Sequence, residues 1–133
     1  MGYGAVLRLR NLSTALILTA TPTLADGLVV AALGDSLTAG YGLATAEGFV
    51  PQLQAWLDAE GIPAEIRNAG VSGDTTAGGL ARVDWTLTPD VDGMIVALGG
   101  NDYLRGFDPA LSRENLTGIV EAAKAKDLSL IHI

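Results

Sequence analysis

The sequence has 133 residues, enough for one domain, with no cysteine and a single histidine. Disulfides, thiolate metal sites and multi-histidine metal sites are therefore excluded. The formal net charge of −7, from 8 basic and 15 acidic residues, argues against nucleic acid and anionic membrane surfaces as partners, because both select clustered lysine and arginine.

Residues 1–25 have the pattern of a secretory signal peptide. Arg8 and Arg10 supply a positive amino-terminal region, residues 12–20 form a short apolar stretch, and residues 23–25 fit the small-residue cleavage rule. The apolar stretch is too short to cross about 30 Å of hydrocarbon, so we expect no stable membrane span. We therefore expect cleavage before Asp26 and a periplasmic or secreted location, with an uncleaved anchor as the alternative.

Three similar units follow, and each contains an apolar run, a glycine-rich turn and a helical pattern. The apolar runs predict strands that are buried on both faces, and their alternation with helices predicts a parallel α/β sheet with right-handed crossovers. In the first helix, Phe49, Leu53, Trp56 and Leu57 would form one apolar stripe. The expected strands cover residues 28–33, 64–68 and 93–98, and the expected helices cover residues 48–60, residues 75–85 and a stretch that begins at Asp108-Pro109.

The glycine-rich turns all follow the carboxyl ends of strands. Ligands of open parallel sheets bind beyond these ends, so the turns should meet at one crevice although they lie far apart in the sequence. The first turn presents Ser36, whose hydroxyl is a candidate nucleophile and whose backbone N–H is a candidate oxyanion donor. Gly70 at the second strand end and Asn101 at the third are candidates for a backbone donor and a side-chain donor.

Each of these residues also has a plain structural interpretation. Ser36 could cap a helix, Gly70 could serve only its turn, and Asn101 could satisfy a local turn. A glycine-rich turn could instead cradle phosphate in a non-catalytic, flavodoxin-like small-molecule binding module. That alternative is weaker, because the turn lacks a Walker-type Gly-Lys-Ser/Thr and has no basic residue beside it.

The three turns together carry a family resemblance. Residues 34–37, Gly-Asp-Ser-Leu, match the GDSL block of SGNH hydrolases, residues 68–76 resemble their glycine block, and residues 98–102 resemble their Gly-x-Asn-Asp block. The flanking residues 37–43 and 78–82 match as well. Over residues 28–127 the chain resembles the bacterial periplasmic group of arylesterase, thioesterase I and lysophospholipase L1.

The resemblance implies a three-layer α/β/α, flavodoxin-like fold with a parallel sheet, and a serine ester hydrolase that needs no metal or cofactor. It implies that Ser36 is the nucleophile and that the N–H groups of Ser36 and Gly70, with the Asn101 side chain, bind the oxyanion. The implied substrates are small acyl esters or thioesters, such as aryl esters, acyl-CoA and lysophospholipids. The acids expected to brace turns and loops, rather than to act in catalysis, are Asp35, Asp74 and Asp102.

One block of the family is absent from the sequence. The family's Asp-x-x-His block supplies the general base and the acid that orients it, and no Asp-x-x-His occurs here. His132 is the only imidazole, and its apolar, strand-like surroundings place it inside the sheet. We therefore expect residues 26–127 to form the amino-terminal part of a hydrolase domain whose sheet is incomplete at its carboxyl-terminal side. We expect this chain alone to be inactive.

Residues 128–133 have a second peculiarity. Their sequence, Leu-Ser-Leu-Ile-His-Ile, can be encoded by a run of bases that matches a common transposase sequencing adapter. We expect this tail to be non-native, and we expect the source locus to diverge from the present sequence near Asp127. Continuous native sequence for the tail at that locus would refute the expectation.

Overall fold

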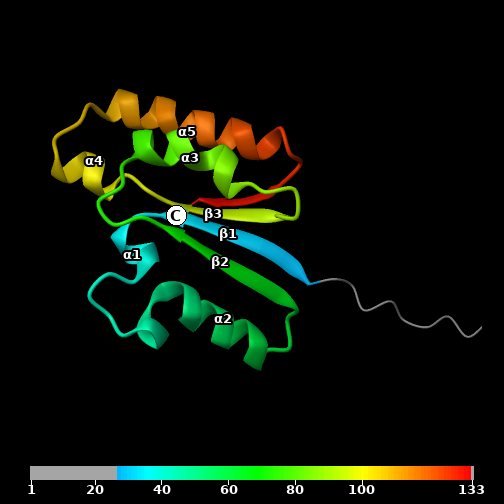
Figure 1. Cartoon of the computed structure of the whole chain (residues 1–133). Helices are drawn as coiled ribbons and strands as arrows, with labels where there is room; N and C mark the ends of the chain where they lie inside the picture. The colour runs from blue at the N-terminus through cyan, green and yellow to red at the C-terminus, as the bar shows by residue number, and fades with distance from the viewer. Residues whose placement is uncertain (1–26, 133) are drawn as a thin grey trace, which may run out of the picture.

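The computed structural model describes residues 27–132, which form a parallel four-stranded sheet between two layers of helices (Figure 1). The signal peptide expected at residues 1–25 lies outside the described residues. The strand order is β2-β1-β3-β4, and all three pairings are parallel. The strands are β1 (Leu28–Gly34), β2 (Ala64–Gly70), β3 (Gly93–Ala97) and β4 (Ser129–His132).

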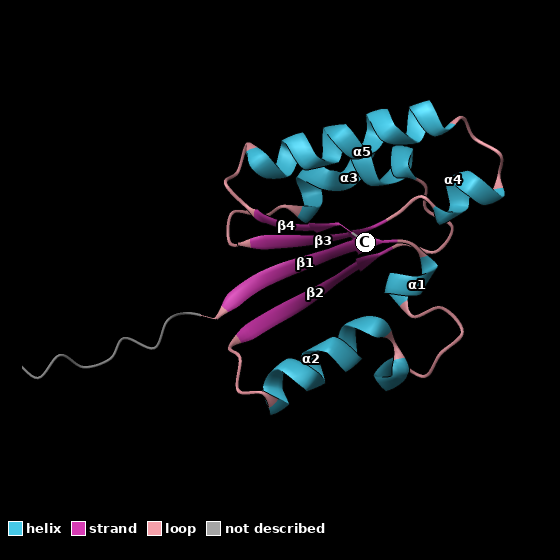
Figure 2. Cartoon of the chain, turned by 180° about the vertical axis from the view of Figure 1, so that it is seen from behind, coloured by secondary structure: helices cyan, strands magenta, loops and turns pink. Residues whose placement is uncertain are grey.

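Helices cover both faces of this sheet, as the view from behind shows (Figure 2). Helix α2 (Phe49–Ala59) covers one face, and α3 (Thr76–Thr86) and α5 (Pro109–Lys124) cover the other. Three short elements, α1 (Ser36–Ala39), η1 (Thr45–Glu47) and α4 (Gly100–Leu104), lie in the connections. Among residues 27–132, no helix has the length and apolar character that a membrane crossing requires.

The predicted α/β architecture is confirmed, with two corrections of detail. The three expected strands and three expected helices are present, and Asp108 caps α5 by accepting a hydrogen bond from the Ala110 N–H at 2.8 Å. The stripe predicted on α2 is partly wrong, because the side chain of Trp56 is 56% exposed while Val50 is buried. The one-turn helices α1 and α4 were not expected, since so few residues give no helical periodicity.

The main core lies between the sheet and the α3/α5 layer. Its fully buried members include Leu33 from β1, Val96 from β3 and Ile119 from α5. Burial of a side chain of this size stabilises the fold by roughly 1.5–3 kcal/mol. A smaller cluster of Ala32, Val50 and Ile95 joins the sheet to α2. The sheet is therefore held from both faces, which fixes the positions of the strand ends.

The pairing register brings the carboxyl ends of three strands to one edge. Gly34, the last residue of β1, is paired with Gly70, the last residue of β2, and with Ala97, the last residue of β3. The connections that follow these residues therefore start side by side. The predicted convergence of the three turns is thus confirmed by the register.

Candidate active site

Helix α1 packs directly on the ends of β1 and β2. A methyl group added to Gly34 would overlap Thr38, and one added to Gly70 would overlap the backbone of Ala39. Both glycines are therefore required by the close approach of α1. The glycines at the ends of β1 and β2 are thus explained by the packing of α1, without any phosphate.

Ser36 is the first residue of α1, and it is not the residue that caps the helix. Asp35 occupies the cap position, and its Oδ1 accepts a hydrogen bond from the Leu37 N–H at 3.0 Å. Among the hydrogen bonds of the described residues, neither the hydroxyl nor the backbone N–H of Ser36 has a partner. The capping interpretation of Ser36 is therefore wrong, and both groups are free to meet a substrate.

The turns after all three strands are joined by one side-chain amide. Nδ2 of Asn101 donates to the backbone oxygen of Asp74 at 2.8 Å and to Oδ2 of Asp35 at 3.4 Å. Asp35 follows β1, Asp74 follows β2 and Asn101 follows β3. Asn101 therefore does not serve a local turn. The short bond fixes the plane of the amide, and the long bond leaves its second N–H weakly engaged.

The backbone N–H of Gly70, expected to be an oxyanion donor, already has a partner in the structure. Its N–H donates to Oδ1 of Asn68 at 2.9 Å, so this donor is occupied within its own strand. Gly73, three residues later, has a left-handed backbone (φ 80°), and its N–H has no acceptor among the described residues. Its immediate neighbour Asp74 is the residue held by Asn101. The sequence reasoning missed Gly73, although Gly73 stands in the same glycine block.

Asp102, which was expected to brace a loop, is buried and hydrogen-bonded to two other elements. Its carboxylate is 2% exposed and accepts hydrogen bonds from Thr76 N (2.9 Å), Thr76 Oγ1 (2.5 Å) and Ser112 Oγ (3.2 Å). Burial alone would raise the pKa of Asp102, but the hydrogen bonds from Thr76 and Ser112 together hold it below its ordinary value. Because Thr76 begins α3 and Asp102 lies in α4, the ionised carboxylate ties together the connections after β2 and β3.

Residues 32–132 match the sequence profile of the GDSL-like lipase/acylhydrolase family. The chain belongs to this family. It is 41% identical over 118 residues to esterase TesA from Pseudomonas aeruginosa, a match covering 88% of this chain and 58% of TesA. It is 34% identical over 129 residues to an arylesterase from Vibrio mimicus, a match covering 95% of this chain and 62% of the arylesterase.

The fold is shared with solved members of the family. The crystal structure of AlinE4, an SGNH-hydrolase family esterase, aligns with a TM-score of 0.77 and 46% identity over 83% of this chain. That alignment covers 60% of the AlinE4 chain. The chain therefore spans about three fifths of the length of the relatives it matches.

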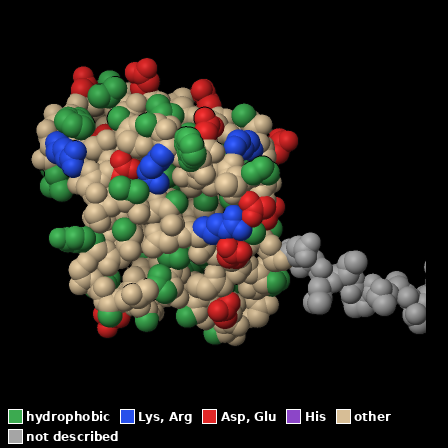
Figure 3. Space-filling model, viewed as in Figure 1, with side chains coloured by type: hydrophobic (Ala, Val, Ile, Leu, Met, Phe, Trp, Pro, Cys, Tyr) green, Lys and Arg blue, Asp and Glu red, His purple; other side chains and the backbone are tan. Residues whose placement is uncertain are grey.

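Exposed apolar side chains gather in the connections at the sheet edge that carries Ser36. They come from the connections after all three strands, and hydrophobic side chains protrude at the left of Figure 3, where α1 and α4 lie in Figure 1. Leu37, beside Ser36, is 81% exposed, and Tyr103 in α4 is 85% exposed. The other members of this apolar rim are Tyr41, Leu43, Val71 and Leu104.

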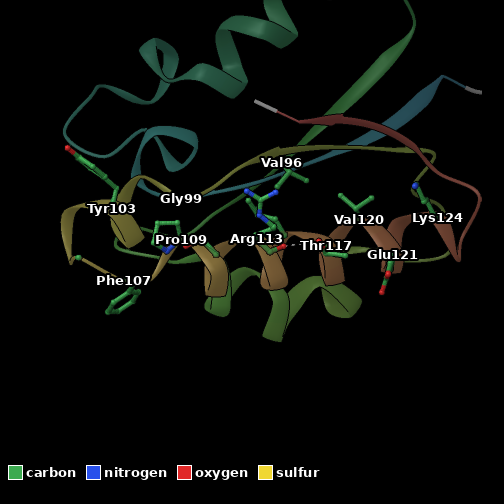
Figure 4. Close-up of a pocket in the computed structure, with 13 residues that line it drawn as sticks. Val96, Gly99, Tyr103, Phe107, Pro109, Arg113, Thr117, Val120, Glu121 and Lys124 are labelled. Atoms are coloured by element: carbon green, nitrogen blue, oxygen red, sulfur yellow. Dashed lines mark hydrogen bonds between the residues drawn. The ribbon is translucent and has the colours of Figure 1, made fainter.

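A cavity lies between β3 and α5, and neither Ser36 nor Asn101 lines it. It has a volume of about 790 Å³ and runs along α5 beside β3, from Gly99 and Tyr103 at one end to Lys124 at the other (Figure 4). Leu116 and Val120 of α5 line it, on a helix face adjacent to the one that Ile119 buries in the core. This groove is an apolar surface on the β4 side of the sheet and is separate from the serine.

His132 lies in β4, inside the sheet, as expected. Its backbone is paired with Val96 of β3. β3 separates β4 from β1, the strand that leads to Ser36. His132 is therefore on a strand that is not adjacent to the strand leading to Ser36.

Proposed function

We propose that this chain is the amino-terminal part of an exported serine ester hydrolase that acts through an acyl-enzyme on Ser36. The observation that carries the proposal is the free hydroxyl and free N–H of Ser36 at a strand edge where Asn101 holds three connections together. A nucleophile next to preorganised donors is what acyl transfer requires. The family's esterases and the expected signal peptide support the activity and a periplasmic or secreted location.

In the proposed reaction, Oγ of Ser36 attacks the carbonyl carbon of an ester or thioester, and the carbonyl oxygen becomes an oxyanion. The alcohol or thiol leaves, and water then releases the acid and restores the serine. The proton from Ser36 passes to a histidine in an Asp-x-x-His segment of the full-length enzyme, which gives it to the leaving alcohol or thiol, then takes a proton from the attacking water and returns it to Ser36. Loss of such a base costs roughly a millionfold in kcat, or about 8 kcal/mol of barrier, which accounts for the expected inactivity of this chain alone.

Three donors would stabilise the oxyanion: the N–H of Ser36, one backbone N–H from the connection after β2, and the Asn101 Nδ2–H whose only acceptor within residues 27–132 is Asp35 at 3.4 Å, a bond long enough for the oxyanion to replace. For that third donor we favour Gly73 over Gly70, because the Gly70 N–H is bonded to Asn68 and the Gly73 N–H is free. Each such donor is worth about 3 kcal/mol in the transition state.

Replacement of a backbone N–H by an ester oxygen tests the choice between the two glycines. We expect an ester at position 73 of the full-length enzyme to lower kcat by about a hundredfold or more, since one transition-state donor is lost. An ester at position 70 is the matched control, and it should cost much less because it removes only the bond to Asn68. The reverse ranking would restore Gly70 as the donor.

The apolar rim suggests the kind of substrate. Leu37, Tyr41, Val71 and Tyr103 expose hydrophobic surface next to the serine, and an apolar acyl or aryl group would bury that surface on binding. The net charge of −7 disfavours polyanionic partners. We therefore favour neutral aryl or short to medium acyl esters over acyl-CoA among the classes implied by the family resemblance.

The function is tested by hydrolysis of p-nitrophenyl butyrate with the full-length enzyme. Ser36→Ala should lose at least about a thousandfold in kcat/KM, since it removes the nucleophile. Thr88→Ala is the matched control, because its exposed hydroxyl donates to Asp90 in the loop before β3, and its activity should stay close to wild type. A Ser36→Ala enzyme as active as Thr88→Ala would overturn the proposal.

A further inference from the structure

The side chain of Arg82, on α3, connects the ends of two strands with the loop between β2 and α3. Nη2 donates to the backbone oxygen of Gly34 at 3.0 Å, and Nη1 donates to the backbone oxygen of Ala69 at 2.7 Å. Nε donates to Oδ2 of Asp74 at 2.8 Å. The side chains of Arg82 and Asp74 are 24% and 11% exposed, so this ion pair is largely shielded from solvent.

These three contacts bracket the proposed oxyanion donors. Gly34 lies two residues before Ser36, so its carbonyl fixes the start of the serine turn. Ala69 and Asp74 lie on either side of residues 70–73, which include both candidate glycines. Asp74 is also the residue whose backbone oxygen accepts the Asn101 amide at 2.8 Å. The guanidinium of Arg82 therefore holds the segments on both sides of the backbone donors. It is also linked to the Asn101 amide, because Asp74 contacts both Arg82 and Asn101.

The spacing of residues 74, 78 and 82 makes this arrangement possible. Gly78 and Arg82 are four apart and lie on one face of α3, and Asp74, just before the N-cap Thr75, turns its carboxylate onto the same face. A methyl group added to Gly78 would overlap Oδ1 of Asp74. The missing side chain at position 78 therefore leaves the space in which the Asp74 carboxylate turns toward Arg82.

We propose that Arg82 is a positioning residue for the oxyanion hole, an inference that rests on the esterase function proposed above. The planar fork of arginine sends donors in several fixed directions, and here three of them end on three different segments. A lysine has the same charge, but its single nitrogen cannot span these acceptors. Oxyanion donors act only when they are held where the charge develops, so loss of the fork misplaces them in the transition state.

The experiment compares three variants of the full-length enzyme with wild type on p-nitrophenyl butyrate. Arg82→Lys removes the fork but keeps the charge, and Gly78→Ala displaces Asp74 while Arg82 stays in place. Arg67→Lys is the matched control, because Arg67 pairs with the exposed acids Glu65 and Asp90 and contacts none of the three connections. Each variant's Tm is measured, and rates are taken well below the lowest Tm.

We expect Arg82→Lys and Gly78→Ala each to lower kcat by about tenfold to a hundredfold, with KM within about threefold of wild type. Affinity for a boronic-acid transition-state analogue should fall by the same factor as kcat. Arg67→Lys should leave kcat and analogue affinity unchanged. A merely structural role of Arg82 predicts a lower Tm with normal kcat in the folded enzyme.

The outcomes separate this inference from the function on which it rests. If wild type hydrolyses the ester and binds the boronic acid, but Arg82→Lys and Gly78→Ala keep wild-type kcat, the positioning role is wrong and the esterase function stands. If wild type itself neither hydrolyses the ester nor binds the boronic acid, the proposed function fails and the inference fails with it. If kcat falls in Arg82→Lys but stays normal in Gly78→Ala, then Arg82 does not position Asn101 through Asp74.

Discussion

Replacing Asp102 by asparagine should destabilise the fold far more than the loss of one exposed charge. The carboxylate is 2% exposed and accepts three hydrogen bonds, one from a backbone N–H and two from hydroxyls. Asparagine has one acceptor oxygen, so its NH₂ group must face the Thr76 N–H or the Thr76 and Ser112 hydroxyls. The Thr76 hydroxyl already accepts from Nδ2 of Asn115 at 3.0 Å, which limits its freedom to turn.

The expected cost is about 2–4 kcal/mol, because charge-assisted bonds are lost and a buried donor is left without an acceptor. Urea unfolding of the chain followed by circular dichroism measures it. Asp108→Asn is the matched control: Asp108 also accepts a backbone N–H, but it is an exposed helix cap, where asparagine serves as well as aspartate. Equal losses in stability for the two variants would refute the reasoning.

The stability lost in Asp102→Asn should depend on pH. The folded pKa of Asp102 is lowered, so its stabilising contribution is complete above the unfolded pKa of about 4 and is lost as the pH falls through the lower, folded value. The difference in unfolding free energy between wild type and Asp102→Asn should therefore be largest near pH 7 and shrink below about pH 4. A difference that stays constant from pH 7 to pH 3 would show that the carboxylate charge is not involved.

Three further outcomes follow from the packing around α1 and α3. Gly70→Ala keeps the N–H but overlaps the Ala39 backbone, so it should cost about 3 kcal/mol in urea unfolding, whereas Gly42→Ala, with open space around it, should cost about 1 kcal/mol. Thr75→Ala removes the cap to the Gly78 N–H and should cost about 1 kcal/mol by the same assay. Leu37→Asp should raise KM for p-nitrophenyl butyrate more than for p-nitrophenyl acetate; equal effects on both would remove Leu37 from the acyl site.

The positions that the sequence reasoning places at one edge of the sheet are those fixed by the topology. Ser36 and Asn101 follow strand ends that a parallel sheet must bring to one edge, and the register confirms this convergence. The donor role of Gly70 stays a prediction, and the sequence does not show that α1 packs on this glycine or that Asn68 accepts its N–H. Arg82 was not assigned a role, since its contact with Gly34 spans 48 residues and depends on the finished fold.

The exposure of Trp56 was missed for a different reason. The spacing of Trp56 places it in the same stripe of α2 as Phe49 and Leu53. In the structure, the side chains that pack on the sheet are those of Leu53 and of Val50, which is the residue after Phe49. A helix with apolar residues on a wide arc does not specify which part of the arc is buried. That choice is made by tertiary packing.

The central claim is that Ser36 is the nucleophile, and a fluorophosphonate probe tests it most directly. The full-length enzyme is incubated with the probe, digested, and the modified peptide is located by mass spectrometry. The account predicts a single adduct on Ser36 that is absent from Ser36→Ala. An adduct on another residue, or an enzyme that hydrolyses esters while Ser36 stays unmodified, would contradict it.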